Sequence, residues 1–305
     1  MKIHIPPFAA AVIGKLCADG YEAYAVGGCV RDTMLGRAPN DWDVTTSVLP
    51  ETTLSLFSCA DGFKAVPTGI AHGTVTVISG GEPVEVTTFR VDGKYSDHRR
   101  PDSVGFTGRL EEDLARRDFT INAMAYSPER GLIDPYGGER DLVDRIIRCV
   151  GEPERRFDED ALRILRALRF ASTLGFEIDD QTAEAAVRLR RLILDISRER
   201  VSAELEKLLL GQDAEKILCE YEPVFLTTIP ELADEDFRLA AECAGKLSVY
   251  GDFALSLAGL FCGLSEKTLG AALAGLKLPK KVSSRTRHAV LNAHAPLGGR
   301  TEKRS

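Results

Sequence analysis

Long apolar runs, paired cysteines and an excess of positive charge are all missing from this sequence. No apolar segment approaches the roughly 20 residues that a membrane-spanning helix needs, so no membrane partner is expected. The seven cysteines are scattered and none forms a C-x-x-C pair, which argues against a disulfide framework or a zinc site and favours a reducing cytoplasm. The formal net charge of −7 argues against a surface that is positively charged all over. An RNA partner would therefore have to bind to a local basic face of the protein.

The first half of the chain carries strand signals. Residues 24–26 are apolar and run into Gly27-Gly28, a pattern typical of a buried strand that ends in a tight turn. Strands expected at 74–78 and 84–89 flank a Ser-Gly-Gly turn and predict a hairpin. Short apolar runs that alternate with turn signals over residues 1–150 predict an α+β domain.

The second half of the chain is expected to be all helical. Apolar residues recur at helical spacing over 158–173, and Gly175 is a candidate C-cap for that helix. Further helices are expected over 181–194, over 197–210 and over most of 233–292. No internal repeat interrupts this pattern, and no feature specifies an oligomeric state.

Two aspartates on a short predicted strand are the central feature. Asp41 and Asp43 follow Gly27-Gly28 after twelve intervening residues, and alternate residues of a strand point to the same face. Like charges so close repel unless a cation lies between them, and Mg²⁺ prefers such oxygen ligands. Two Mg²⁺ ions stabilise both the attacking and the leaving oxygen of an in-line displacement, while a glycine turn lets backbone N–H groups approach a triphosphate. We therefore predict that Asp41 and Asp43 are catalytic metal ligands.

A third carboxylate, Glu85, lies between valines on the second arm of the predicted hairpin. On a strand, its side chain either faces the two aspartates as a third catalytic group or lies on an exposed position of the sheet. The sequence leaves both interpretations open.

Charged residues recur at every third position beside an apolar stripe in the segment 159–169. Asp160 and Arg163 are followed by Arg166 and Arg169. An aspartate that accepts and an arginine that donates hydrogen bonds match the Watson–Crick edge of cytosine and, slightly shifted, that of adenine. Ordinary i,i+3 salt bridges are the alternative, but three arginines in this pattern favour an anion nearby.

Five further motifs narrow the interpretation. The Gly-Gly and Asp-x-Asp pattern resembles the polymerase-beta nucleotidyltransferase superfamily, and the motifs together resemble the bacterial class II tRNA nucleotidyltransferases, with bacterial poly(A) polymerases as close relatives. The resemblance covers roughly residues 20–210. The motifs are VGGCVRD (26–32), YSDHRRP (95–101), RRDFTINA (116–123), IDPYGG (133–138) and RFDEDALRILRALRF (156–170).

The resemblance implies a set of nucleotide-binding residues. Asp160 and Arg163 act as a protein template that selects CTP and then ATP, and Arg117 holds the sugar or the triphosphate. Arg166 and Arg169 complete a phosphate clamp or brace the template. The full set is Gly27, Gly28, Arg31, Arg117, Asp160, Arg163, Arg166 and Arg169.

Structural roles stay open for some of these residues. Arg31 and Arg117 also fit ion pairs with Asp32 and Asp118, respectively, and Asn122 caps a helix as readily as it contacts a ligand.

The resemblance also implies a fold and an activity. We expect a polymerase-beta-like head with a mixed sheet over 1–150, a helical neck over 151–210 and a shortened helical body over 211–305. The implied activity is CCA addition to the tRNA 3′ end from CTP and ATP with Mg²⁺, and the polar loop 92–102 favours full CCA addition. The basic stretch from Lys277 onward is either an RNA contact or a solvated surface.

Three other functions remain in view. Poly(A) addition or a CC-only or A-only activity uses the same chemistry, and few residues separate these specificities. A non-catalytic RNA-binding module and an enzyme that modifies a small molecule are further alternatives. The intact aspartate pair argues against a non-catalytic RNA-binding module. The template-like pair Asp160 and Arg163 argues against modification of a small molecule. None of the five histidines precedes an aspartate, so the phosphohydrolase activity of some relatives is not expected.

Overall fold

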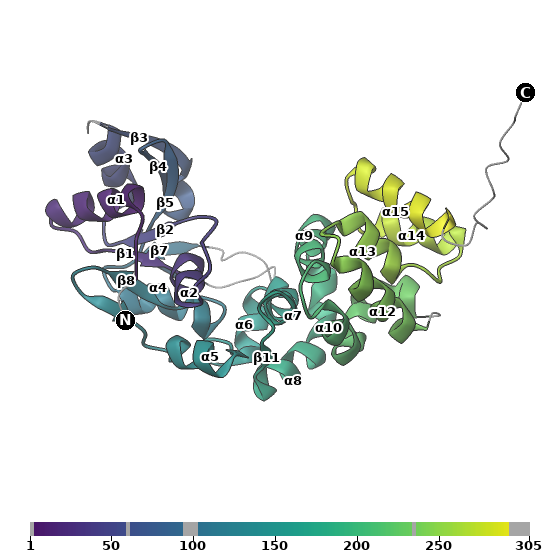
Figure 1. The fold of residues 1–305 in the computed structure, drawn as a ribbon. Coiled ribbons are helices and arrows are strands. Elements are labelled where there is room, and N and C mark those ends of the chain that lie inside the picture. Colours follow the sequence, from purple (N-terminus) through teal and green to yellow (C-terminus); the bar gives the residue numbers. More distant parts are fainter. Residues whose placement is uncertain (1–2, 59–61, 94–102, 234–235, 293–305) are drawn as a thin grey trace, which may run out of the picture. The chain divides into compact units, whose positions relative to one another are not determined.

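The computed structural model describes residues 3–58, 62–93, 103–233 and 236–292 (Figure 1). The chain forms two compact units, residues 1–159 and residues 160–305. The first unit contains the sheet and the second is almost entirely helical, which confirms the predicted α+β class. The finer division into head, neck and body at residues 150 and 210 stays a prediction.

The first unit is built on a seven-stranded mixed sheet with the order β3-β4-β5-β2-β1-β8-β9. Every neighbouring pair is antiparallel except β2 and β5, which are parallel. The strands of the sheet are β1 (Ala23–Val26), β2 (Asp43–Thr46), β3 (Phe63–Gly69), β4 (Thr74–Ser79), β5 (Glu82–Thr88), β8 (Ala125–Ser127) and β9 (Gly131–Ile133). Strands β6 (Arg90–Asp92) and β7 (Val104–Phe106) form a separate antiparallel pair.

The two faces of this sheet have different chemistry because side chains alternate along each strand. Val44, Val75 and Val86 are buried on the face that packs against α1 (Pro7–Ala18) and α3 (Pro50–Ser58). Asp43, Thr45 and other polar residues of β2, β4 and β5 lie on the opposite face. The candidate site is therefore on the polar face of the sheet.

Four more helices complete the first unit. They are α2 (Gly28–Met34), α4 (Leu110–Ala115), α5 (Gly138–Asp144) and α6 (Pro153–Glu159), joined by a short 3₁₀ turn η2 (Thr120–Asn122) and the two-residue strand β10 (Ile146–Ile147). Helix α4 packs Leu110 and Leu114 into a buried cluster with Tyr24, Val26 and Phe89. This packing places α4 against the face of the sheet that carries Thr45, at the apolar residues of β1.

The second unit packs its helices pairwise, with α7 against α9 and α12 against α13 among the largest interfaces. The helices are α7 (Leu162–Leu174), α8 (Asp180–Arg188), α9 (Arg198–Leu209), α10 (Ala214–Glu220), α11 (Glu222–Thr228), α12 (Phe237–Ser248), α13 (Phe253–Leu260), α14 (Glu266–Gly275) and α15 (Lys280–Asn292). A 3₁₀ helix η3 (Arg190–Asp195) and the short strand β11 (Glu177–Ile178) lie between them. No helix among the described residues is long and apolar enough to cross a membrane.

Two predicted helices differ in the structure. The helix expected over 158–173 is interrupted between α6 and α7, because the Asp160 side chain accepts a hydrogen bond from the backbone N–H of Leu162 (3.1 Å) and so competes with helical pairing. The helix expected over 181–194 ends at Arg188 and continues as η3. Gly175 does end α7, with φ of 73°, as predicted.

Candidate active site

The predicted carboxylates lie together at one end of β2. Asp43 begins β2 and is the direct partner of Glu85 in the parallel β2–β5 pair, so both side chains share the polar face. Burial, followed by the charges of Asp41 and Glu85, raises the pKa of Asp43 from 3.8 to about 6, and the nearby Arg117 opposes this shift. A bound cation would relieve this electrostatic repulsion among the three carboxylates.

These carboxylates fit Mg²⁺ better than a metal that needs a complete protein cage. Within the described ranges, no three His, Cys, Asp or Glu side chains are already gathered as metal ligands. Mg²⁺ commonly uses one or two carboxylates and takes its remaining ligands from water and substrate phosphates. Asp41 and Asp43, with Glu85 beside them, match that requirement.

The glycine turn that precedes α2 is the second part of the site. Gly27 has φ of 78° and ψ of −129°, a conformation that residues with side chains rarely adopt. A Cβ atom at Gly27 would also lie 2.9 Å from Nη1 of Arg117. The positive φ therefore favours glycine at this turn, and the turn brings its backbone close to the Arg117 side chain.

Arg31 lies on α2 in a buried network. Its Nε and Nη2 donate to the two carboxylate oxygens of Asp32 (2.8 and 2.9 Å), and its Nη1 donates to Oδ1 of Asn122 (2.6 Å). The Asn122 amide donates in turn to Asp118 (3.0 Å). The pair with Asp32 matches the structural alternative for Arg31, whereas Asn122 bridges two side chains instead of capping a helix.

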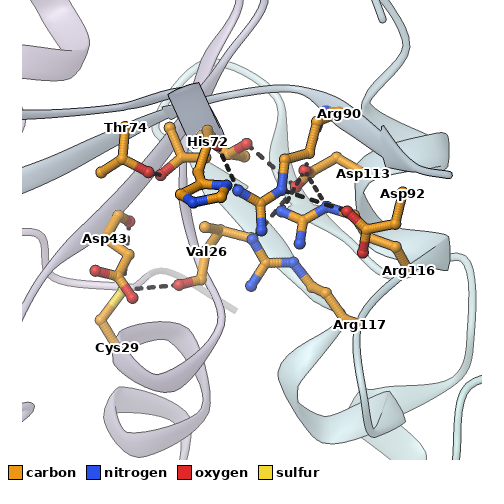
Figure 2. Close-up of polar contacts among 12 residues, drawn as sticks. Val26, Cys29, Asp43, His72, Thr74, Arg90, Asp92, Asp113, Arg116 and Arg117 are labelled. Carbon is orange, nitrogen blue, oxygen red and sulfur yellow. Dashed lines mark hydrogen bonds and ion pairs between the residues drawn. The ribbon is translucent and has the colours of Figure 1, made fainter. Parts of the chain in front are cut away.

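Arg117 has a different partner from Asp118, the residue named in its structural alternative. Its Nη2 donates to Oδ2 of Asp113 (3.3 Å), a fully buried carboxylate on α4. Figure 2 shows Asp113 between Arg90, Arg116 and Arg117, with Asp43 on the other side of Arg117. Sequence reasoning missed Asp113, although its spacing of three and four residues from the Arg-Arg pair is a signal for helical ion pairs.

In the second unit, α9 holds one of the two template candidates, Asp160. Oδ2 of Asp160 accepts a hydrogen bond from Nη2 of Arg200 (2.8 Å), and Arg163 is buried on the first turn of α7. Asp160 is therefore fixed from two sides, by Arg200 and by the backbone of Leu162.

Arg166 and Arg169 contact one carboxylate and one aromatic ring. Glu204, one turn after Arg200 on α9, lies 2.6 Å from Nε of Arg169 and 3.8 Å from Nη1 of Arg166. Both guanidinium groups lie over the ring of Phe170, at 3.8 Å for Arg169 and 5.5 Å for Arg166. This geometry supports the bracing role more than the phosphate clamp. The i,i+4 spacing of Arg200 and Glu204 was visible in the sequence, but their partners were not.

The predicted site residues thus form two groups, one in each unit. Asp41, Asp43, Glu85, the glycine turn, Arg31 and Arg117 belong to the first unit, and Asp160, Arg163, Arg166 and Arg169 belong to the second. The motif at 95–101 and most of the loop 92–102 lie outside the described residues, as does the end of the basic stretch after residue 292.

Two family models match the chain. The model described as "Poly A polymerase head domain" matches residues 23–148, which include the glycine turn and all three carboxylates. The model described as "Probable RNA and SrmB- binding site of polymerase A" matches residues 175–233.

Curated relatives cover most of the chain. A CCA-adding enzyme of Geobacillus thermodenitrificans is 44% identical over 280 residues, which span 91% of this chain and 68% of that protein. A CCA-adding enzyme of Geobacillus stearothermophilus is 48% identical over 77% of this chain and 58% of its own length. The chain thus spans between about half and two thirds of the curated relatives that it matches.

Solved structures have the same fold. The CCA-adding enzyme of Bacillus stearothermophilus in complex with CTP is 35% identical, with a TM-score of 0.66 over 96% of this chain and 80% of that one. A CCA-adding enzyme of Thermotoga maritima complexed with tRNA_CCA is 23% identical with a TM-score of 0.73 over 96% of this chain and 74% of that one, which shows the fold alone.

Proposed function

This chain belongs to the family of the CCA-adding enzymes, and from that membership we propose that it adds CCA to the 3′ end of tRNA, using CTP and ATP as substrates. The observation that carries this proposal is the pair of Asp43 and Glu85 on the polar face of the sheet, with Asp41 just before β2 and Arg117 close to both Asp43 and the glycine turn. That arrangement unites repelling carboxylates, which attract a divalent cation, with a cationic side chain that attracts phosphates.

Asp41 and Asp43 are the proposed ligands of two Mg²⁺ ions, with Glu85 as a third acidic group. When bound, the ions supply positive charge at the attacking and leaving oxygens of the phosphoryl transfer. In this scheme the chain's own carboxylates fix where the cations bind and take no part in proton transfer. The oxygen of the terminal ribose 3′-hydroxyl of the RNA forms a bond to the α-phosphorus of the nucleotide, and the hydroxyl proton passes to solvent. The bond from the α-phosphorus to the bridging oxygen breaks, and pyrophosphate leaves.

The incoming nucleotide is held by the glycine turn and the arginines. The backbone N–H of Gly28 approaches the phosphates because no side chain intervenes. The N–H of Gly27 donates to the carbonyl oxygen of Met124 (3.2 Å) and so fixes the turn. Arg117 adds a charged donor beside that turn, and Arg31 extends the buried network behind it. Such contacts neutralise the triphosphate and position it for attack.

The base of the nucleotide is selected by Asp160 and Arg163. Asp160 accepts from the amino group of cytosine or adenine, and Arg163 donates to the ring acceptors. Arg200 fixes the Asp160 carboxylate, which supports a rigid template. Arg166, Arg169 and Glu204 brace the same helix.

Cellular location and partners follow from the same proposal. We place the enzyme in the cytoplasm, where the six described cysteines stay as free thiols in a reducing environment. The RNA partner is tRNA, and the stretch that matches the RNA-binding model, residues 175–233, is the first candidate for its contact surface.

The test is nucleotide addition to three tRNA transcripts that end before CCA, after C and after CC. The transcripts are incubated with Mg²⁺ and with CTP and ATP singly and together. Ordered addition of C, C and A is the expected result, and it should disappear with EDTA and with Asp43→Asn. Asp144→Asn, which neutralises an exposed carboxylate on α5 of the same unit, is the matched control and should leave addition unchanged.

Other outcomes separate the alternatives. Long tails of A indicate poly(A) polymerase activity, and addition that stops after C residues or consists of a single A indicates a partial enzyme. If folded protein binds tRNA but extends none of the transcripts, the catalytic proposal is wrong and the chain is an RNA-binding module.

A further inference from the structure

Asp113 is a buried carboxylate with every acceptor position in use. It lies on α4 with no exposed surface. Its Oδ1 accepts from Nε and Nη2 of Arg116 (3.0 and 2.7 Å) and from the backbone N–H of Arg90 (3.3 Å). Its Oδ2 accepts from the Thr45 hydroxyl (3.2 Å) and from Nη2 of Arg117 (3.3 Å). A carboxylate has about four lone-pair positions, so this group is saturated.

These contacts join Asp113 to both parts of the candidate site. Thr45 lies two residues after Asp43 on β2 and points to the same face of the sheet. Arg117, held at one end by Asp113, extends its Nη1 to the Gly27 turn. One carboxylate therefore connects β2, the strand that begins at Asp43, to the arginine beside the glycine turn.

Three arginines surround Asp113, and its negative charge offsets theirs. Arg90, Arg116 and Arg117 are close enough to affect one another: burial first, and then the charge of Arg116, lowers the pKa of Arg90. Burial alone would raise the pKa of Asp113, but the charges of Arg117 and Arg116 outweigh burial and leave this pKa below its ordinary value. A neutral side chain at this position leaves the guanidinium groups to repel each other.

We propose that Asp113 is a positioning residue for nucleotide binding: by holding Arg117 beside the Gly27 turn and at a fixed place relative to β2, it sets the affinity for the triphosphate of the incoming nucleotide. This inference rests on the proposed function, because it assigns Arg117 to the nucleotide. Asp113 touches no reacting atom in this scheme and acts through Arg117.

The test compares Asp113→Asn with Asp141→Asn. Asp141 is an equally suitable buried carboxylate of the first unit, bound to Thr120 (2.6 Å) and to Arg148 (3.2 Å), but it does not contact Arg117. We expect Asp113→Asn to raise the KM for CTP about tenfold, the usual effect of losing a hydrogen bond to a charged group, and to leave the KM for tRNA unchanged. Asp141→Asn should change neither KM. Equal KM values for CTP in the two folded variants would overturn the proposal.

A double-mutant cycle with Arg117→Lys separates positioning from a general structural effect. The increase in the KM for CTP caused by Arg117→Lys should be several-fold smaller in the Asp113→Asn background than in the wild-type protein, because Arg117 is already displaced there. If Asp113→Asn does not fold, Thr45→Val, which removes one donor to Asp113, replaces it in the same cycle. If the two substitutions in a cycle raise the KM for CTP independently, so that their effects multiply, the proposal is contradicted. This holds whether the partner of Arg117→Lys is Asp113→Asn or Thr45→Val.

Failure of the proposed function gives a different result. In that case the wild-type protein extends no transcript, and no KM exists to compare. If the wild-type protein adds nucleotides and only the Asp113 comparison fails, CCA addition stands and the role of Asp113 is wrong.

Discussion

Asp43 and Asp113 are two acidic residues of one domain with opposite surroundings. Asp43 is crowded by Asp41 and Glu85, and its pKa is raised to about 6. Asp113 is more deeply buried, yet arginines and donors surround it and its pKa is lowered. Burial alone therefore does not identify a functional carboxylate; what distinguishes Asp43 is that its neighbours leave its charge uncompensated. The protein itself stabilises the ionised form of Asp113, whereas the ionised form of Asp43 needs a bound ligand to stabilise it.

The strongest test of this contrast is the activity of Asp43→Asn. Removing a carboxylate that fixes the catalytic cations should lower kcat for CTP addition by at least about a thousandfold, compared with the tenfold KM effect expected for Asp113→Asn. Single-turnover extension of tRNA measures the chemical step directly. A loss of less than about tenfold in kcat would mean that Asp43 does not hold a catalytic metal.

The second test is the stability of Asp113→Asn. Leaving buried arginines without their carboxylate should lower the free energy of unfolding by about 3 kcal/mol. Because the pKa of Asp113 is lowered in the folded state, its contribution is complete above the unfolded pKa near 3.8 and is lost as the pH falls below that value. Urea denaturation at pH 7 and at pH 3.5 measures the effect, and an equal difference between wild type and variant at both pH values contradicts it.

Asp43→Asn should change stability in the opposite direction. The raised pKa of Asp43 means that its ionised form destabilises the fold, fully above about pH 6 and not at all below about pH 4. Without divalent metal at pH 7.5, the variant should be about 2 kcal/mol more stable than wild type, after allowance for partial exposure. Thermal unfolding in EDTA is the measurement. A less stable variant would show that other contacts already compensate the charge.

Arg200→Gln extends the comparison to a third acid, Asp160, whose charge is partly compensated. Losing this contact should reduce the discrimination of CTP against UTP by several-fold, a smaller effect because the pair is partly exposed. The ratio of kcat/KM for the two nucleotides measures it. Arg191→Gln, an exposed arginine in η3, is the control. Unchanged discrimination would mean that the backbone of Leu162 alone fixes Asp160.

Local features of this molecule could be predicted from the sequence, and long-range ones could not. The Gly27 turn and the facing of Asp43 depend on neighbouring residues, and both were predicted. The partner of Arg117 could not be identified, because Asp113 and Asp118 are both close to it in sequence and only the packing of α4 decides between them. The pair of Asp160 and Arg200 joins residues 40 positions apart, and no local pattern specifies it.

The single parallel strand pair also has a consequence for folding. Parallel strands need a crossover connection, and here α3, β3 and β4 lie in the chain between β2 and β5, the two strands whose pairing makes Asp43 and Glu85 neighbours. Contacts so distant in sequence form late and slowly compared with local turns. The chain therefore brings these repelling carboxylates together later than the local turns and the β4–β5 hairpin, and high metal affinity arises only once β5 has paired with β2.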